Sequence, residues 1–264
     1  MSLLDPYDET SPSARRNLGL ATVAFVLVTW SLLSGLELVE KAKLPSPWAV
    51  AVAFTRLAWD AERGSLLLTA TIASVTRILA ASVLVFIVGI PVGILMGSSP
   101  RINAALSPLV DPFRSAPIVA VFPIFVMWLG IDEAVKIAFL FAGAVVYLVP
   151  MVRDAIQAVP STYWVSARDL GATPFEAIRL SVLPMAMPRI ADGVITAVSV
   201  MWTYITVAEY VNADKGLGQL IQNARRASAM DKVFVGIFVI VALALLNYQF
   251  MVWAKRRLFP WEVA

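Results

Sequence analysis

The chain has 264 residues, of which 59% are hydrophobic and 15% charged, and its net charge is +3. Because soluble domains carry about a quarter charged residues, this composition argues against a soluble fold. The chain has no cysteine and no histidine, which excludes disulfides, thiolate chemistry, and histidine metal ligands or general bases. Its basic residues form no concentrated patch of the kind that binds nucleic acid.

Long uncharged runs predict an integral membrane protein with six transmembrane helices. Crossing the hydrocarbon takes about 20 apolar helical residues, with a range of roughly 17–25. The third, fourth and fifth runs are marginal in length unless each helix continues past a flanking charge, whose side chain can snorkel to the interface. Five or seven spans, with a marginal run buried or re-entrant, are the alternatives. The runs are residues 18–36, 78–96, 115–131, 137–152, 193–208 and 233–254.

The N-terminal part of the chain predicts a retained first span. Residues 1–17 are polar and are expected to form a cytoplasmic tail. The run at 18–36 is longer than the h-region of a cleaved signal peptide, and no A-x-A site follows it. Residues 37–64 are then a periplasmic segment, in which an amphipathic stretch between Trp48 and Trp59 predicts a helix lying at the membrane interface.

Small residues and prolines shape the next two spans. Gly89, Gly93 and Gly97 recur every four residues, a pattern that lets another helix approach closely. Pro117 and Pro123 lie in the third run and are each expected to kink it, which membrane helices tolerate when neighbours satisfy the freed carbonyls.

The distribution of basic residues predicts the orientation only weakly. With the N-terminus inside, eleven Lys and Arg residues fall on the inner side and nine on the outer side, while Arg77 lies within a span. This bias favours two cytoplasmic termini. The C-terminal tail is then residues 255–264, which begins with three basic residues.

The longest soluble stretch between the later spans, residues 153–187, predicts a pair of short helices. Ser161 is expected to cap the first helix, and Gly171 to end it in the left-handed conformation. Thr173 is expected to cap the second helix, with a proline at the first helical position and Glu176 completing a capping box. A capped loop without further function is the alternative.

This stretch resembles the EAA loop of binding-protein-dependent ABC importer permeases. The family pattern is Glu-Ala-Ala, three residues, Gly, nine residues, Ile, one residue and Leu-Pro. The chain departs from it at Val165, where the family has Glu, and at Ser181, where it has Ile. The missing Glu removes any charge contact made there but leaves the helix pair intact. The matching residues are Ala167, Gly171, Leu183 and Pro184.

The resemblance extends over about residues 65–250. It is carried by the order and spacing of several short segments, and it is strongest to the nitrate, sulfonate, taurine and bicarbonate branch of the family. The segments are Arg77-Ile-Leu, Gly89-Ile-Pro-Val-Gly93, Arg114-Ser-Ala-Pro117 with the residues that follow to Gly130, Pro188-Arg-Ile-Ala-Asp-Gly193, Trp202, Ala208-Glu209 and Gly216-Leu-Gly218-Gln-Leu-Ile221.

The resemblance implies an all-α, type I ABC importer permease fold, with the permease domain at residues 65–254. It implies a bacterial inner-membrane complex of two permease copies, expected to be a homodimer, with two ATP-binding subunits and an extracytoplasmic substrate-binding protein. ATP and Mg are then bound by the partner subunits, and the chain itself needs no cofactor. The residues expected to couple to the ATPase are Ala167, Arg168, Gly171, Ala172, Leu183 and Pro184.

The sequence also predicts that the chain does not itself hydrolyse ATP. It has no G-x-x-x-x-G-K-[ST] sequence and therefore no phosphate-cradling loop of that kind. An intramembrane enzyme would lack the usual catalytic groups, since His, Cys and the G-x-S-x-G motif are all absent. A secondary transporter working alone is a further alternative, against which the capped loop and the lack of an internal repeat argue.

Polar side chains inside the spans are candidates for a substrate pathway. Five on the fifth span, spaced by 4, 3, 4 and 3 residues, share one helical face. That stripe either lines a hydrated pathway or makes hydrogen bonds between helices or back to its own carbonyls. Arg77 suits an anion, but it could equally pair with an acid or snorkel outward. The candidates are Arg77, Asp192, Thr196, Ser199, Thr203, Thr206 and Glu209.

The expected substrate is a small anion of the nitrate, sulfonate, taurine or bicarbonate type. This expectation follows from the resemblance, and Arg77 only agrees with it. The alternative within the same architecture is an uncharged or cationic metabolite such as a vitamin precursor. Glu209, at the outer end of the fifth span, is expected to pair with a nearby Lys or Arg.

Overall fold

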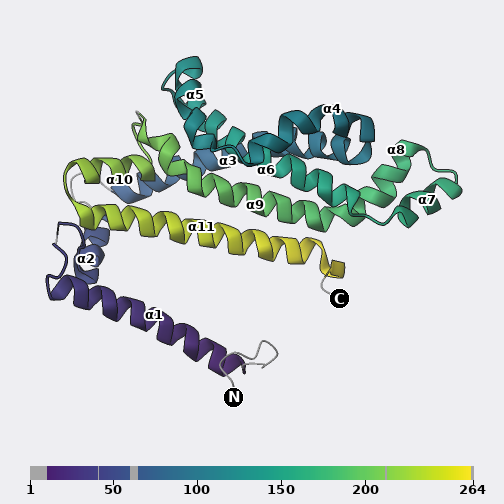
Figure 1. The fold of residues 1–264 in the computed structure, drawn as a ribbon. Coiled ribbons are helices and arrows are strands. Elements are labelled where there is room, and N and C mark those ends of the chain that lie inside the picture. The colour runs from purple at the N-terminus through teal and green to yellow at the C-terminus, as the bar shows by residue number, and fades with distance from the viewer. Residues whose placement is uncertain (1–10, 41, 60–64, 212, 263–264) are drawn as a thin grey trace.

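A computed structural model describes residues 11–40, 42–59, 65–211 and 213–262, and the secondary structure within these ranges is helical (Figure 1). Residues 1–10 of the predicted tail and residues 60–64 of the predicted periplasmic segment lie outside them. The helices are α1 (Pro12–Gly35), α2 (Pro47–Ala58), α3 (Leu66–Ser98), α4 (Pro100–Val110), α5 (Phe122–Leu129), α6 (Glu133–Gln157), α7 (Ser161–Asp169), α8 (Pro174–Ala177), α9 (Leu183–Tyr210), α10 (Leu217–Arg226) and α11 (Met230–Leu258).

Within the described residues, five helices are long and apolar enough to cross a membrane: α1, α3, α6, the continuous helix Pro174–Tyr210, and α11. Each extends beyond its uncharged run and past a flanking charge. A sixth span is reached only by joining Pro100–Arg114 to Ile118–Leu129, two pieces that meet at an angle of 96°. The break falls at the start of the third predicted run, 115–131, which reaches a spanning length only together with residues 100–114.

Proline accounts for the position of that break. Pro117 has an extended ψ of 90° and precedes the single 3-10 turn η2 (Ile118–Val121), and the residue before a proline is disfavoured in helical geometry. The other predicted kink is wrong. Pro123 lies in the first turn of α5, where its missing N–H leaves no helical hydrogen bond unmade.

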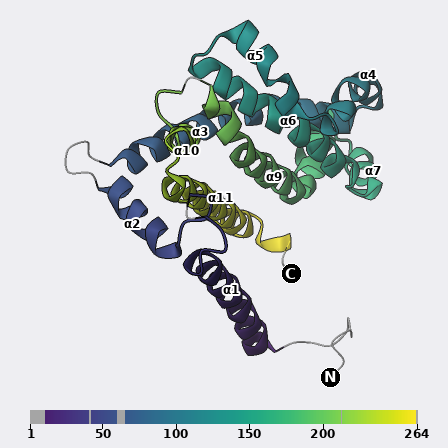
Figure 2. The same ribbon diagram turned by 60° about the vertical axis from the view of Figure 1, so that its left-hand side comes forward.

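The core of the bundle is the packing of α3 against α6 and of α6 against α9 (Figures 1 and 2). The predicted glycine stripe lies at the first contact. A Cβ atom on Gly93 would fall 2.5 Å from Cβ of Val152, and one on Gly97 would fall 2.6 Å from Cβ of Ile156. The absence of side chains thus lets the two helix backbones approach, as the pattern predicts.

Helix α1 stands apart from this core (Figures 1 and 2), and Ser34 is its one buried residue. Trp30 attaches it by stacking on Phe234 of α11, with ring centroids 5.7 Å apart, and by donating its indole N–H to the carbonyl of Pro45. The helix begins at Pro12 with Ser11 as its cap, six residues before the predicted first span. The predicted amphipathic helix is present as α2, while its place at the membrane interface stays a prediction.

The predicted helix pair is present but differs in detail. Gly171 has a φ of +87°, and Thr173 with Glu176 forms the complete capping box. The predicted Ser161 cap is wrong, because α7 begins at Ser161 itself and has no side-chain cap.

The second helix of the pair is not a separate short helix. It continues from α8 through a π turn, η3 (Ile178–Val182), into α9. This turn ends at Val182, two residues before Pro184. Pro184 cannot donate an N–H, and its ring would clash with the carbonyl four residues back in a regular α-helix. A local wide turn relieves that conflict without ending the helix. The second helix of the pair therefore runs directly into the fifth span.

Candidate functional site

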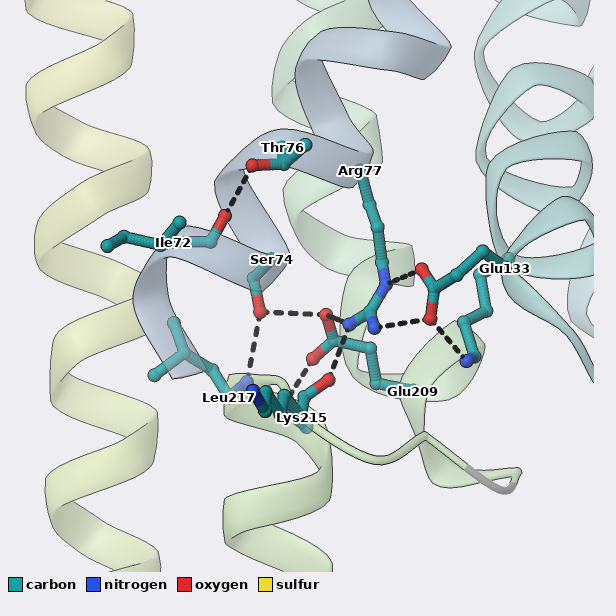
Figure 3. A network of polar contacts seen from close by, with 10 residues as sticks. Ile72, Ser74, Thr76, Arg77, Glu133, Glu209, Lys215 and Leu217 are labelled. Atoms are coloured by element: carbon teal, nitrogen blue, oxygen red, sulfur yellow. Dashed lines mark hydrogen bonds and ion pairs between the residues drawn. The ribbon is translucent and has the colours of Figure 1, made fainter. Parts of the chain in front are cut away.

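An ionic network with a buried centre joins α3, α6, α9 and the start of α10 (Figure 3). Arg77 on α3 is only 5% exposed. Its Nε and Nη2 donate to the two carboxylate oxygens of Glu133, at 2.6 and 2.7 Å. Its Nη1 donates to Glu209 on α9 and to the carbonyl of Lys215, both at 2.7 Å. The guanidinium is therefore surrounded by acceptors from other elements.

Glu209 is fully buried and is held on both oxygens. Oε1 also accepts from the hydroxyl of Ser74 at 2.7 Å, and Oε2 accepts from the backbone N–H of Gly218 at 2.7 Å. Ser74 in turn accepts from the N–H of Leu217 at 2.9 Å. The start of α10 is thereby tied to α3 and α9.

Gly216 is the residue that lets this turn approach the charges. Its φ is +145°, and a Cβ atom there would lie 2.5 Å from the carboxylate of Glu209 and 2.7 Å from Nη1 of Arg77. Both the backbone conformation and the space require glycine.

Sequence reasoning found Arg77 and Glu209 but missed Glu133, Lys136 and Ser74. Lys136 donates to Glu133 at 2.8 Å, so the cluster contains two cations and two anions. Glu133 and Lys136 are three residues apart, a spacing that makes them neighbours on a helix. That signal was lost because the connection before the fourth span was predicted to reach Lys136, whereas α6 begins at Glu133.

The polar stripe of the fifth span lies on α9, and its hydroxyls bond back to their own helix. Thr196 donates to the carbonyl of Asp192 at 2.9 Å, Ser199 to that of Ile195 at 2.7 Å, and Thr203 to that of Val200 at 2.7 Å. Thr203 is exposed, and Thr196, Ser199 and Thr206 are half-buried. The stripe therefore lies on a face that the rest of the described chain leaves partly open.

Asp192, the first residue of the stripe in the sequence, is paired. Lys255 of α11 donates to both of its carboxylate oxygens at 2.8 Å. This pair joins α9 to the end of α11 and leaves Asp192 half-exposed.

The helix pair presents an apolar surface around Gly171. Leu170 is 89% exposed, Phe175 69% and Leu180 70%. Arg168 closes the turn by donating to the carbonyl of Ala172. Beside it lies a groove of about 830 Å³, lined by Pro160, Thr162, Tyr163, Ser166, Ala167, Leu170, Ala172, Glu176, Leu180 and Ser181.

The predicted coupling residues divide into two groups. Ala167 and Ala172 line the groove, and Arg168 and Gly171 form its closing turn. Leu183 and Pro184 lie in the first turn of α9 and do not line the groove. Figure 1 shows the pair at the right-hand end of the molecule, toward which α11 also ends, whereas α2 and α10 lie at the opposite end.

Comparison with known proteins agrees with this architecture. The taurine transport system permease protein TauC of Escherichia coli is 32% identical over 254 residues, covering 95% of this chain and 91% of TauC. The putative aliphatic sulfonates transport permease protein SsuC of Bacillus subtilis is 30% identical over 245 residues, covering 92% of this chain and 87% of SsuC.

A solved structure confirms the fold. A chain of the MetNI methionine ABC transporter, in an inward-facing conformation, superimposes with a TM-score of 0.65 at 21% identity, covering 73% of this chain and 95% of that chain. Residues 89–260 match the family described as binding-protein-dependent transport system inner membrane component. The chain therefore belongs to this family of ABC importer permeases and has the type I permease fold.

Proposed function

We propose that two copies of this chain form the pathway by which an ABC importer carries a small anion of the sulfonate, taurine, nitrate or bicarbonate type. Members of this family are non-catalytic permease subunits, and ATP hydrolysis belongs to separate subunits. The anion class is supported by the relatives, which are named for taurine and aliphatic sulfonates.

The observation that carries the coupling role is the exposed apolar surface on the helix pair. Exposing three large apolar side chains to water is unfavourable; these are Leu170, Phe175 and Leu180. They lie on or beside a turn that is held by a capping box. We infer that the partner ATPase docks there. Because α8 continues into α9 without a loop, a displacement of the docked pair would be transmitted directly to the fifth span.

The open face of α9 is the proposed lining of the pathway. Polar side chains in a membrane protein face the bundle interior or a water-filled cavity rather than lipid. However, three of the stripe hydroxyls each donate a hydrogen bond to a backbone carbonyl of their own helix. The stripe can therefore hydrate the pathway through its oxygen atoms, but it offers few donors to an anion.

The buried network has a different proposed role. Arg77 already makes four hydrogen bonds to acceptors of the protein, so an incoming anion would have to displace Glu133 or Glu209. We infer that Arg77 and Glu209 hold the outer end of the bundle together rather than bind substrate. Of the roles that the sequence left open for Arg77, this is the one in which it pairs with an acid.

With α7 and α8 on the cytoplasmic side, the end of α11 lies toward that side too (Figure 1), and six spans return the start of α1 to the same side. The opposite end, with α2 and α10, then faces the substrate-binding protein. The complex is proposed to sit in the bacterial inner membrane as a permease homodimer with two ATPase subunits.

Transport by the reconstituted complex tests this proposal. The chain would be placed in liposomes with its ATPase subunits and binding protein, and uptake of radiolabelled taurine, nitrate and bicarbonate would be measured with and without ATP. We expect ATP-dependent uptake of one anion and none from the chain alone. Uptake restricted to neutral or cationic solutes would contradict the anion class, and uptake without ATP would indicate a stand-alone transporter.

A further inference from the structure

The stretch between α4 and α5 runs along α6 without forming an α-helix. At its inner end, Arg153 on α6 donates to Asp111 at 2.8 Å. At its outer end, the ring of Phe122 packs on Phe139 of α6, with centroids 4.6 Å apart. Phe139 and Arg153 lie fourteen positions apart on α6, which is about 21 Å of helix. Residues 112–121 therefore pass through most of a hydrocarbon core of roughly 30 Å.

This stretch exposes irregular backbone. It consists of two single 3-10 turns, η1 (Asp111–Arg114) and η2 (Ile118–Val121), separated by residues 115–117. All residues from 112 to 117 are exposed, whereas Ile118 is buried. Non-helical backbone at membrane depth is tolerated only where protein covers it or where it lines a water-filled cavity. A lipid-facing position is therefore excluded.

Arg114 is the charge within this stretch. It is exposed, and among the residues that the structure describes no acid pairs with it, since the ion pairs there involve other cations. Arg77 and Arg153, by contrast, are each held by two carboxylates. Arg114 follows Asp111 by three residues and so lies in the inner part of the stretch. An unpaired guanidinium on irregular backbone there marks a candidate functional site or ion pathway.

The end of the stretch at Phe122 and Tyr204 of α9 contact the same residue of α6. The ring of Phe139 contacts Phe122 on one neighbour and Tyr204 of α9 on the other, with centroids 4.6 and 5.8 Å apart. Thr203, the exposed member of the stripe, is adjacent to Tyr204. The stripe supplies oxygen atoms but few donors, while Arg114 supplies five N–H donors and a fixed positive charge.

We propose that residues 111–121 line the translocation pathway and that Arg114 is its anion-selecting residue. The guanidinium fork matches two oxygens of a sulfonate, nitrate or bicarbonate, and water in the pathway leaves the contact weak enough for release. This inference rests on the proposed function for the anion class. It assigns selectivity to the unpaired Arg114 and not to the clamped Arg77.

Charge-selective labelling tests the placement without knowledge of the substrate. The native chain has no cysteine, so Ser115→Cys in the full importer complex reports on this stretch alone. Its rate of modification would be measured with two methanethiosulfonate reagents of similar size, one carrying an ethylsulfonate and one an ethyltrimethylammonium group, in each nucleotide state. The same measurement follows in Arg114→Gln, Arg114→Lys and Arg101→Gln backgrounds.

We expect Ser115→Cys to react in at least one nucleotide state and to favour the anionic reagent. Removing a unit charge within a few ångströms should lower the anionic-to-cationic rate ratio about tenfold in Arg114→Gln. Arg114→Lys should retain most of the preference. Arg101→Gln, which removes an exposed charge from the start of the same broken span, should leave the ratio unchanged.

If Arg114→Gln fails to assemble, the role of Arg114 can still be tested in the chain that retains it, by comparing two cysteine positions. The ratio at Ser115→Cys should then exceed the ratio at Thr203→Cys, which lies farther along the proposed pathway. An inert Ser115→Cys in every nucleotide state, or a ratio that Arg114→Gln does not change, would overturn the inference. Anion uptake could still occur in that case, and the liposome uptake assay tests the proposed function separately.

Discussion

Arg77 on α3 and Glu209 on α9 are 132 residues apart in the sequence, yet Nη1 and Oε1 lie 2.7 Å apart. Both side chains are buried, and Glu133 on α6 completes the guanidinium's set of partners. A buried pair is costly to break because the remaining charge is left without compensation. The network should therefore behave as one unit that holds α3, α6, α9 and the start of α10.

Removing one member of this network should destabilise the folded chain strongly. We expect Arg77→Met to cost about 3–5 kcal/mol, because the buried carboxylate of Glu209 loses its cation. The double variant Arg77→Met with Glu209→Met should cost less than the sum of the single changes, since Glu133 keeps Lys136. Thermal unfolding in detergent would measure this.

The control for this cycle is the pair at the other end of α9. Asp192 is half-exposed in its contact with Lys255, so Asp192→Asn should change stability by about 1 kcal/mol or less. Equal losses from Arg77→Met and Asp192→Asn, or additive single changes in the cycle, would contradict a buried cooperative network.

The close contact of α3 with α6 should fail when a side chain is added to it. A Cβ atom on Gly93 would overlap Val152, so Gly93→Val should force the helices apart and cost about 1–3 kcal/mol or more. A Cβ atom on Gly19 of α1 would have no other group within 4 Å, and Gly19→Val is the matched control. Monodisperse yield and melting temperature should fall for the first variant alone.

Gly171 should be needed for coupling and not only for its backbone conformation. Gly171 and Gly130 both have positive φ and open space around them, so a side chain should strain each backbone by about 1–3 kcal/mol. Gly171→Trp should also obstruct the apolar surface and reduce ATPase binding and transport, while Gly130→Trp should not. Co-purification of the ATPase subunits measures this, and normal binding by Gly171→Trp would show that docking occurs elsewhere.

The open face of α9 should react with water-soluble thiol reagents if it lines the pathway. Single cysteines at Thr196, Ser199, Thr203 and Thr206 should be modified, at rates that change when ATP is trapped on the partner subunits. Cysteine at Val198, which is buried, should react much more slowly. Val200 is a poorer control, because the structure leaves it half-buried. Stripe positions that stay inert in every state would favour a packing role.

Local signals in the sequence determined much of this protein. Long apolar runs predicted the spans, because a helix in hydrocarbon must satisfy its own backbone over a length that the bilayer sets. The Thr173–Glu176 capping box, the left-handed Gly171 and the close approach at Gly93 were also predictable. Each depends on residues within about one turn or on a regular helical repeat.

Tertiary structure alone decided how the charges are used. The sequence places Arg77 within a span but cannot show that Glu133 and Glu209 close around it, because that meeting depends on how three helices pack. It predicts kinks at two prolines but not a break of 96°. Whether an intramembrane arginine is clamped, as Arg77 is, or unpaired among the described residues, as Arg114 is, depends on partners brought together from distant parts of the chain.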